Sequence, residues 1–165
     1  MKNIFCSLSD LTNEASTETF FINRLLDYLG FGDNNLKLKT SISEYTVGQG
    51  RKKCLYKPDY VAIINGYPVM VIDAKSPCED ITKWEEQCSS YALEINKEYD
   101  YNPVKYYILS NGIKTNLYIW DKKEPLICLA FEDFVETNPN FQEFIHIVRK
   151  DRLELISSEL KNNLD

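Results

Sequence analysis

Two apolar runs joined by a tight turn constrain the fold of this 165-residue chain more than any other feature. Residues 60–64 and 69–74 are rich in β-branched and other apolar side chains, and the Asn65-Gly66 dipeptide between them strongly indicates a β-hairpin. The apolar character of the second run ends at the charged residues Asp73 and Lys75. The sequence therefore predicts two antiparallel strands in the centre of a sheet, with polar side chains where the second strand ends.

The length of the turn decides whether Asp59 lies on the same face of the hairpin as Asp73. Because side chains alternate along a strand, a plain two-residue turn sends the two carboxylates to opposite faces. A three-residue loop over residues 64–66, with Gly66 in the left-handed position of a β-bulge, places Asp59 opposite Val71 and on the face of Asp73. We predict the three-residue loop.

Helical and strand patterns flank this hairpin on both sides. Apolar spacing predicts helices at residues 13–29, 80–99, near 134 and 141–160, further strands at 36–47, 106–109, 117–120 and 126–129, and a turn at 48–50. This order predicts an α/β fold in which a mixed central β-sheet is flanked by helices. We expect residues 1–137 to form the main domain and residues 138–165 a helical extension, packed on it or leading out of it.

Composition excludes several classes of protein. With 44% hydrophobic and 13% aromatic residues the chain can bury one core, and no apolar run is long enough for a membrane span or a secretory signal, so we expect a cytoplasmic protein. His146 is the only histidine, and none of the five cysteines forms a Cys-x-x-Cys pair, which excludes a histidine triad and argues against a zinc site. No glycine-rich phosphate-binding motif is present, so we expect no ATP site.

The distribution of charge points to local rather than general affinity for nucleic acid. A formal net charge of -6 argues against a surface that binds DNA non-specifically. The one concentrated basic run is Arg51, Lys52 and Lys53, followed by Lys57 just before Asp59. We predict that these side chains contact DNA, and a solvated loop is the alternative.

Asp59, Asp73 and Lys75 form the candidate active centre. Alternation along the strand puts Asp73 and Lys75 on one face and turns Ala74 to the other, which leaves its carbonyl free as a ligand. The carboxylates of Asp59 and Asp73 with the Ala74 carbonyl are hard oxygen donors that suit Mg²⁺ and tolerate Mn²⁺. A metal held in this way could polarise a phosphate oxygen and lower the pKa of a bound water, and Lys75 could orient or deprotonate the attacking water. These groups predict phosphodiester hydrolysis. From spacing alone, a strand-end salt bridge between Asp73 and Lys75 is the alternative.

These residues resemble a known nuclease signature. Lys57-Pro58-Asp59 with Asp73-Ala74-Lys75 resembles the PD-(D/E)XK motif, and Gln87 with Tyr91 resembles the Gln-x-x-x-Tyr motif of the RecB-like branch. Further similarities, at residues 13–15, 29–31, 69–77, 109–112 and 117–118, are to the N-terminal nuclease domain of the restriction subunit of type I restriction-modification enzymes. The resemblance covers roughly residues 12–135.

The resemblance implies a restriction-endonuclease-like sandwich, with residues 1–137 as the nuclease domain. It implies an Mg²⁺-dependent endonuclease that cleaves double-stranded DNA beside an ATP-dependent translocase and methylation and specificity subunits. By position, Asp59 and Asp73 would bind the metal and Lys75 would serve the water. Glu14 matches the acidic residue of the first helix, which in this family approaches the metal, and an exposed glutamate at a helix start is the alternative.

The resemblance also suggests roles for Gln87 and Tyr91, which would contact DNA or brace the site, with helix packing as the alternative. The chain departs from the family pattern at Asp73, where most relatives carry glutamate, and at Glu18, where many carry arginine. These 165 residues contain no motor region of the kind found in that family, so we expect either an excised domain or a stand-alone protein. Two other functions stay open: a catalytically silent DNA-binding or docking module, and a RecB-like repair nuclease acting on ends or junctions.

Overall fold

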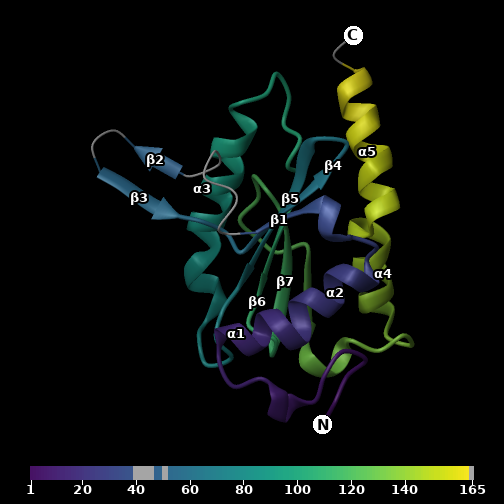
Figure 1. Cartoon of the computed structure of the whole chain (residues 1–165). Coiled ribbons are helices and arrows are strands. Elements are labelled where there is room, and N and C mark those ends of the chain that lie inside the picture. Colours follow the sequence, from purple (N-terminus) through teal and green to yellow (C-terminus); the bar gives the residue numbers. More distant parts are fainter. Residues whose placement is uncertain (39–46, 50–51, 164–165) are drawn as a thin grey trace.

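A mixed sheet of six strands forms the centre of the computed structural model, which describes residues 1–38, 47–49 and 52–163 (Figure 1). Its strands, in spatial order, are β1 (Leu36–Leu38), β4 (Tyr60–Ile64), β5 (Tyr67–Ala74), β6 (Tyr106–Ser110), β7 (Lys114–Ile119) and β8 (Ile127–Ala130). All neighbours are antiparallel except β5 and β6, which are parallel. A separate two-stranded sheet pairs β2 (Val47–Gln49) with β3 (Lys52–Tyr56).

Helices cover both faces of the sheet, as the sequence predicted (Figure 1). One face carries the first helix, α4 (Pro139–Val148) and α5 (Lys150–Asn162). The first helix consists of three consecutive segments, α1 (Glu14–Ser16), a π-helical segment (Thr17–Ile22) and α2 (Asn23–Tyr28). The other face carries a 3-10 turn (Ile81–Trp84) that leads into α3 (Glu85–Asn96). The fold is therefore an α/β sandwich around a mixed sheet.

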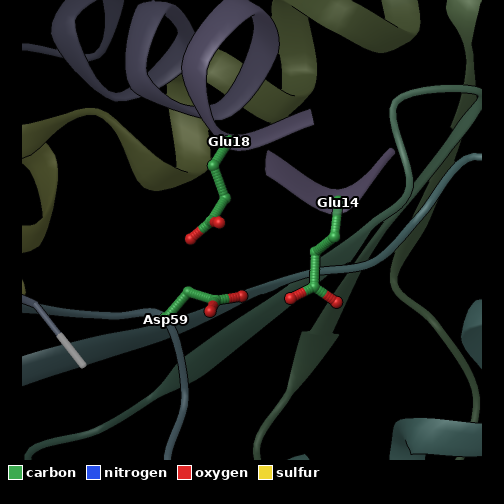
Figure 2. Close-up of side chains that lie close together, drawn as sticks. All are labelled: Glu14, Glu18 and Asp59. Carbon is green, nitrogen blue, oxygen red and sulfur yellow. The ribbon is translucent and has the colours of Figure 1, made fainter. Parts of the chain in front are cut away.

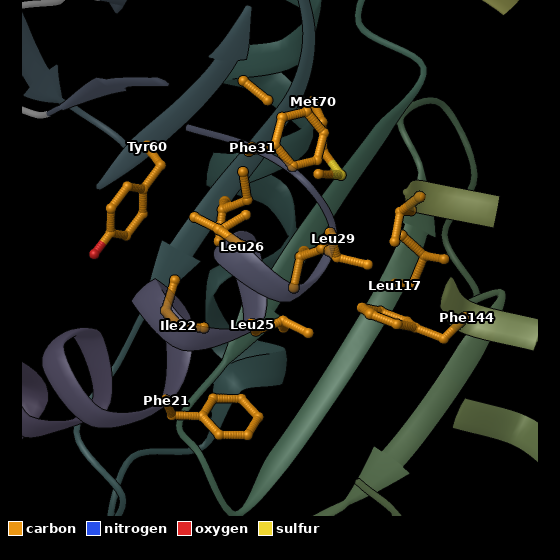
Figure 3. Packing of buried hydrophobic residues seen from close by; sticks show 14 of the residues in the cluster. Phe21, Ile22, Leu25, Leu26, Leu29, Phe31, Tyr60, Met70, Leu117 and Phe144 are labelled. Carbon is orange, nitrogen blue, oxygen red and sulfur yellow. The ribbon is translucent and has the colours of Figure 1, made fainter. Parts of the chain in front are cut away.

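The larger core lies between the first helix, α4 and the sheet (Figure 3). Phe21, Ile22 and Leu25 are at most 1% exposed, because their spacing places them on one side of the helix. The ring of Phe21 meets Phe134 edge to face at 4.8 Å between centroids. Phe144 of α4 closes this core, so α4 packs against the sheet.

A smaller core lies under α3, on the opposite face of the sheet. Cys88, Tyr91 and Ile95 of the helix are at most 1% exposed and pack with Val61 and Val71 of the central hairpin. No helix among the described residues is long and apolar enough to cross a membrane. The position of the domain boundary at residue 137 stays a prediction.

The prediction of a three-residue loop over residues 64–66 in the central hairpin is wrong. Ile64 pairs with Tyr67, so the turn contains only Asn65 and Gly66. Their φ angles are 52° and 83°, the two positive values that a type I′ turn requires. This turn matches the right-handed twist of the strands without any extra residue, which explains why it forms.

A β-bulge in β5 supplies the register shift that the loop was expected to give. Successive residues of β4 pair with Met70 and then Pro68, which leaves Val69 as an extra residue in β5. Continued toward the end of the strand, the shifted register places Asp59 directly opposite Asp73, whereas the predicted loop placed it diagonally. The predicted sharing of one face by the two residues is thus reached by another route.

Three other predicted elements differ from the structure. Gly48 and Gln49, predicted as part of a turn, lie in β2, and residues 39–46 of the predicted strand lie outside the described part of the chain. The short helix near 134 is a single 3-10 turn, Phe131–Asp133. The predicted helix 141–160 is broken at Arg149, whose φ and ψ of -63° and 149° are extended.

The break at Arg149 has a tertiary cause. It directs the amide of Lys150 to the carbonyl of Leu29, to which it donates a hydrogen bond of 2.9 Å. Leu29 is the residue at which the first helix ends, so the bond ties the start of α5 to that helix. An unbroken helix could not make this bond, because the amide of Lys150 would be directed along the helix axis.

The turn after β6 holds the end of β5 in place. The amide of Lys75 donates to the carbonyl of Ser110 at 2.8 Å, and the side-chain amide of Asn111 donates to the carbonyl of Glu79 at 2.8 Å. The hydroxyl of Thr17 donates to the carbonyl of Asn111 at 3.4 Å. One turn therefore connects the first helix, the end of β5 and the loop that follows it.

Gly112 makes this turn possible. Its φ of +84° lies in the left-handed region, and a Cβ atom built there would lie 2.7 Å from Cδ1 of Leu11. The position therefore excludes a side chain on two grounds, backbone conformation and space.

We predict that Gly112→Ala lowers the free energy of unfolding by about 2 kcal/mol or more, the sum of left-handed strain and overpacking. Gly66→Ala is the matched control, since its φ is +83° but no atom lies within 4 Å of the new Cβ. It should lose only about 1 kcal/mol. Urea unfolding of the three proteins measures both values, and equal losses would show that Leu11 moves aside freely.

Candidate active site

The hairpin brings Asp59 and Asp73 side by side at the end of β5. Both are buried, with 4% and 1% of their surfaces exposed. Oδ2 of Asp59 accepts a hydrogen bond of 2.7 Å from the amide of Ala74, and Oδ1 of Asp73 accepts one of 3.2 Å from the amide of Asp59. Each carboxylate is therefore oriented by the backbone of the opposite strand.

Lys75 forms an ion pair with Asp73. Its Nζ lies 2.9 Å from Oδ2 of Asp73, and the residue is only 8% exposed. The structure thus brings together the three residues of the predicted centre. It also contains the salt bridge between Asp73 and Lys75 that was the alternative at the sequence level. This contact is expected both for a catalytic centre and for a structural salt bridge, so it does not distinguish them.

Burial sets the charge state of Asp73. Desolvation, followed by the nearby charge of Asp59, raises the pKa of Asp73 to about 7, against the opposing attraction of Lys75. This carboxyl group therefore holds a proton near neutral pH more readily than an exposed aspartate does. A cation bound beside it would compete with that proton.

The first helix presents two further carboxylates to Asp59. One oxygen from each of Glu14, Glu18 and Asp59 lies within 4.8 Å of the other two, and Figure 2 shows the three side chains pointing toward one another. Glu14 and Glu18 are both half-buried. Glu14 thus approaches the centre as the resemblance implied.

The start of the first helix is fixed by reciprocal capping. Oδ1 of Asn13 accepts a hydrogen bond from the amide of Ser16 at 2.8 Å, and Oγ of Ser16 accepts one from the amide of Asn13 at 2.9 Å. This box places Glu14 in the first turn. Glu18 follows four residues later and lies on the same side of the helix.

Glu18 is the residue that sequence reasoning missed as a possible ligand. In the sequence it stood out only as a departure from the arginine of many relatives. Its signal was the four-residue spacing from Glu14, which places both carboxylates on one helix face.

The donor set fits a hard divalent cation. The carboxylates of Glu14, Glu18 and Asp59 form one group, and Asp73 lies beside Asp59 outside that group. Oxygen donors of this kind suit Mg²⁺ or Mn²⁺ better than they suit softer metals. Of the predicted ligand set, Asp59 and Asp73 are adjacent, and Ala74 contributes its amide to Asp59. The ligand role of the Ala74 carbonyl stays a prediction.

The two predicted DNA-contacting residues of α3 have different surroundings. Gln87 is exposed, so its predicted contact stays open. Tyr91 is 0% exposed and packs with Cys88 and Ala92 in the core under α3. This burial agrees with bracing of the site or with helix packing, and a contact of Tyr91 with DNA stays a prediction.

The predicted basic cluster is only partly described. Lys57 is half-buried and lies two residues before Asp59. The backbones of Lys52 and Lys53 lie in β3, and Arg51 lies outside the described residues. Their DNA contacts remain predictions.

The comparison with protein families agrees with the motifs. The family model described as "Type I restriction enzyme R protein N terminus" matches residues 25–125, which include Asp59, Asp73 and Lys75 but not Glu14. Among solved structures, the type IIG restriction endonuclease BpuSI aligns with a TM-score of 0.39 and 15% identity, over 91% of this chain and 16% of that one. No curated protein matches. Because the family match covers more than half of the chain, this protein belongs to the family of type I restriction enzyme R protein N-terminal domains, as its motifs predicted.

Proposed function

We propose that this chain is the metal-dependent nuclease module of a type I restriction enzyme, and that it hydrolyses phosphodiester bonds of double-stranded DNA. The observation that carries the proposal is the buried arrangement of Asp59, Asp73 and Lys75 at the end of β5, with both carboxylates oriented by backbone amides. Family membership supports a role in restriction.

The proposal includes partners for this module. An ATP-dependent translocase would deliver the DNA, and methylation and specificity subunits would select the target. This division of labour suits a chain whose sequence has no glycine-rich phosphate-binding motif. We propose that the enzyme acts in the cytoplasm.

Asp59 is the residue best placed to hold Mg²⁺ or Mn²⁺, because it belongs both to the pair with Asp73 and to the group with Glu14 and Glu18. A bound cation would polarise a phosphate oxygen and make a neighbouring water more acidic. The hydrogen bond from the Ala74 amide keeps the Asp59 carboxylate in position.

Lys75 would act on the attacking water. Its ammonium lies 2.9 Å from Asp73 and is shielded from bulk solvent, where a charge acts more strongly than in water. We propose that it would orient or deprotonate a water at the end of β5 and offset negative charge developing on phosphorus. Gln87, Lys57 and the basic residues 51–53 would contact the DNA backbone.

A catalytically silent docking module is the second candidate function. The ion pair between Lys75 and Asp73 favours it, because a structural salt bridge at a strand end needs no reaction to explain it. A RecB-like repair nuclease would use the same residues, and a preference for nicked, flapped or branched DNA would identify it. Metal binding and lysine substitution separate the silent module from either nuclease.

We predict that millimolar Mg²⁺ or Mn²⁺ raises the thermal midpoint of the protein at pH 8. Saturation a hundredfold above the dissociation constant corresponds to about 2.7 kcal/mol of stabilisation. Asp59→Asn keeps the acceptor for the Ala74 amide but removes the charge, and should abolish the shift. Glu143→Gln, an exposed carboxylate of α4, is the control and should respond as wild type does. An equal response of Asp59→Asn and wild type would rule out this site.

We predict that, without a divalent cation, the free energy of unfolding falls as pH rises from 4 to 7. The pKa of Asp73 is about 7 in the folded protein against 3.8 for an unperturbed aspartate, so the folded protein holds the extra proton between these values. The stabilisation that comes from protonating Asp73 is therefore fully present below pH 4. It is lost as pH rises to 7, by at most about 1.4 kcal/mol per pH unit.

The variant Asp73→Asn isolates this contribution. Because asparagine does not titrate, the wild type should lose stability relative to the variant between pH 5 and 7 and run parallel to it above pH 8. Urea unfolding in EDTA at these pH values measures the difference. Parallel curves throughout would mean that Asp73 is ionised in the folded protein across this range.

We predict that Lys75→Ala reduces DNA cleavage by about a hundredfold or more, the scale for losing a positioned proton-transfer or electrostatic group. Metal binding should survive, because the carboxylates are retained. The assay joins the chain to its translocase, with ATP and Mg²⁺, and scores double-strand breaks. If wild type cuts and Lys75→Ala cuts equally well, Lys75 is a structural partner of Asp73 alone.

A further inference from the structure

The indole ring of Trp84 lies against the ammonium group of Lys75. Nζ of Lys75 is 3.6 Å from the ring centroid and 2.9 Å from Oδ2 of Asp73. Among the described residues the lysine therefore contacts both an ionic and an aromatic partner. The aromatic partner comes from the layer of α3 and the ionic partner from the sheet.

The position of Trp84 is fixed by the elements around it. Oδ1 of Asp80 accepts hydrogen bonds from the amide of Thr82 at 3.0 Å and from its hydroxyl at 2.7 Å, which starts the 3-10 turn that ends at Trp84. Ile81 of the same turn is 2% exposed and anchors it in the core under α3. The half-buried indole packs against that core. The ring is therefore part of a packed helix start.

An indole face holds an ammonium in a way that a carboxylate does not. It attracts the cation through the ring quadrupole, and this attraction grows when water is excluded, as it is around the 8% exposed Lys75. The ring has no basic lone pair, so it cannot take the proton from Nζ. Trp84 can therefore fix the place of the amine and leave its donors available to other groups.

We propose that Trp84 is a positioning residue for Lys75 and keeps its ammonium at the end of β5 when the carboxylate of Asp73 is shared with a cation. This inference rests on the proposed nuclease function. A cation beside Asp73 weakens the ion pair that holds the flexible stem of Lys75. The indole contact is independent of that carboxylate and persists.

Tryptophan fluorescence tests the contact without any cleavage assay. The chain has two tryptophans, so Trp120→Phe leaves Trp84 as the single emitter. In that background Lys75→Met should change the intensity or wavelength of the Trp84 emission, both in EDTA and in saturating Mg²⁺. Lys83→Met, an exposed lysine next to the ring in sequence, should leave the emission unchanged. A spectrum unaltered by Lys75→Met in Mg²⁺ would overturn the proposal.

Two substitutions of Trp84 test the consequence for the reaction, in the translocase-joined cleavage assay. Trp84→Leu removes the ring face and should lower kcat about tenfold or more, with KM for DNA unchanged, as expected for a misplaced reacting group. Trp84→Phe keeps a ring face and should restore most of the rate. Thermal midpoints of both variants identify any loss that comes from unfolding.

The outcomes separate this inference from the proposed function. Wild-type rates for Trp84→Leu, or equal losses for the leucine and phenylalanine variants, would reject positioning by the ring while the nuclease assignment stands. If the wild type does not cut under these conditions, the nuclease assignment fails. The fluorescence comparison then still decides whether Trp84 holds the ammonium of Lys75.

Discussion

The register of β4 against β5 is the constraint on which the candidate site depends. Side chains alternate along each strand, so a slip of one residue would send Asp59 to the opposite face from Asp73. The two-residue turn alone would produce that slip, and the bulge at Val69 corrects it. Val69 and Met70 consequently both belong to the core under the first helix, although they are neighbours in the chain. One inserted residue thus serves both the packing and the site.

With this register, several acidic side chains lie close together at the site, and Lys75 neutralises only part of their negative charge. The carboxylates of Asp59 and Asp73 lie together in a buried position, the two glutamates of the first helix face Asp59, and the cation of Lys75 is bound to Asp73. Backbone amides stabilise two of these oxygens, but they also hold the like charges in place. Such an arrangement opposes folding unless a proton or a cation relieves the repulsion, which is the condition expected of a metal-binding site.

Features that rest on local patterns could be predicted from the sequence, and features that rest on tertiary contacts could not. The apolar runs and the Asn65-Gly66 turn predicted the hairpin, and the motifs around Asp59 and Asp73 predicted the family that the comparison then showed. The bulge has no such signal, because Val69 looks like any other residue of an apolar strand. The break at Arg149 depends on a hydrogen bond to Leu29, and the burial of Tyr91 depends on which side of α3 meets the sheet. Glu18 was recognisable in principle by its spacing from Glu14, but no local pattern showed that this side of the helix faces Asp59.

The net charge of the chain bears on how the proposed nuclease would meet DNA. Its formal net charge is -6, and the site itself is acidic, so long-range attraction to DNA is weak. A divalent cation at the carboxylates would reverse the local field only within about a Debye length, roughly 8 Å in physiological salt. For the proposed nuclease, productive contact would then depend on a high local concentration of DNA, which the proposed translocase would supply by holding the duplex beside the site.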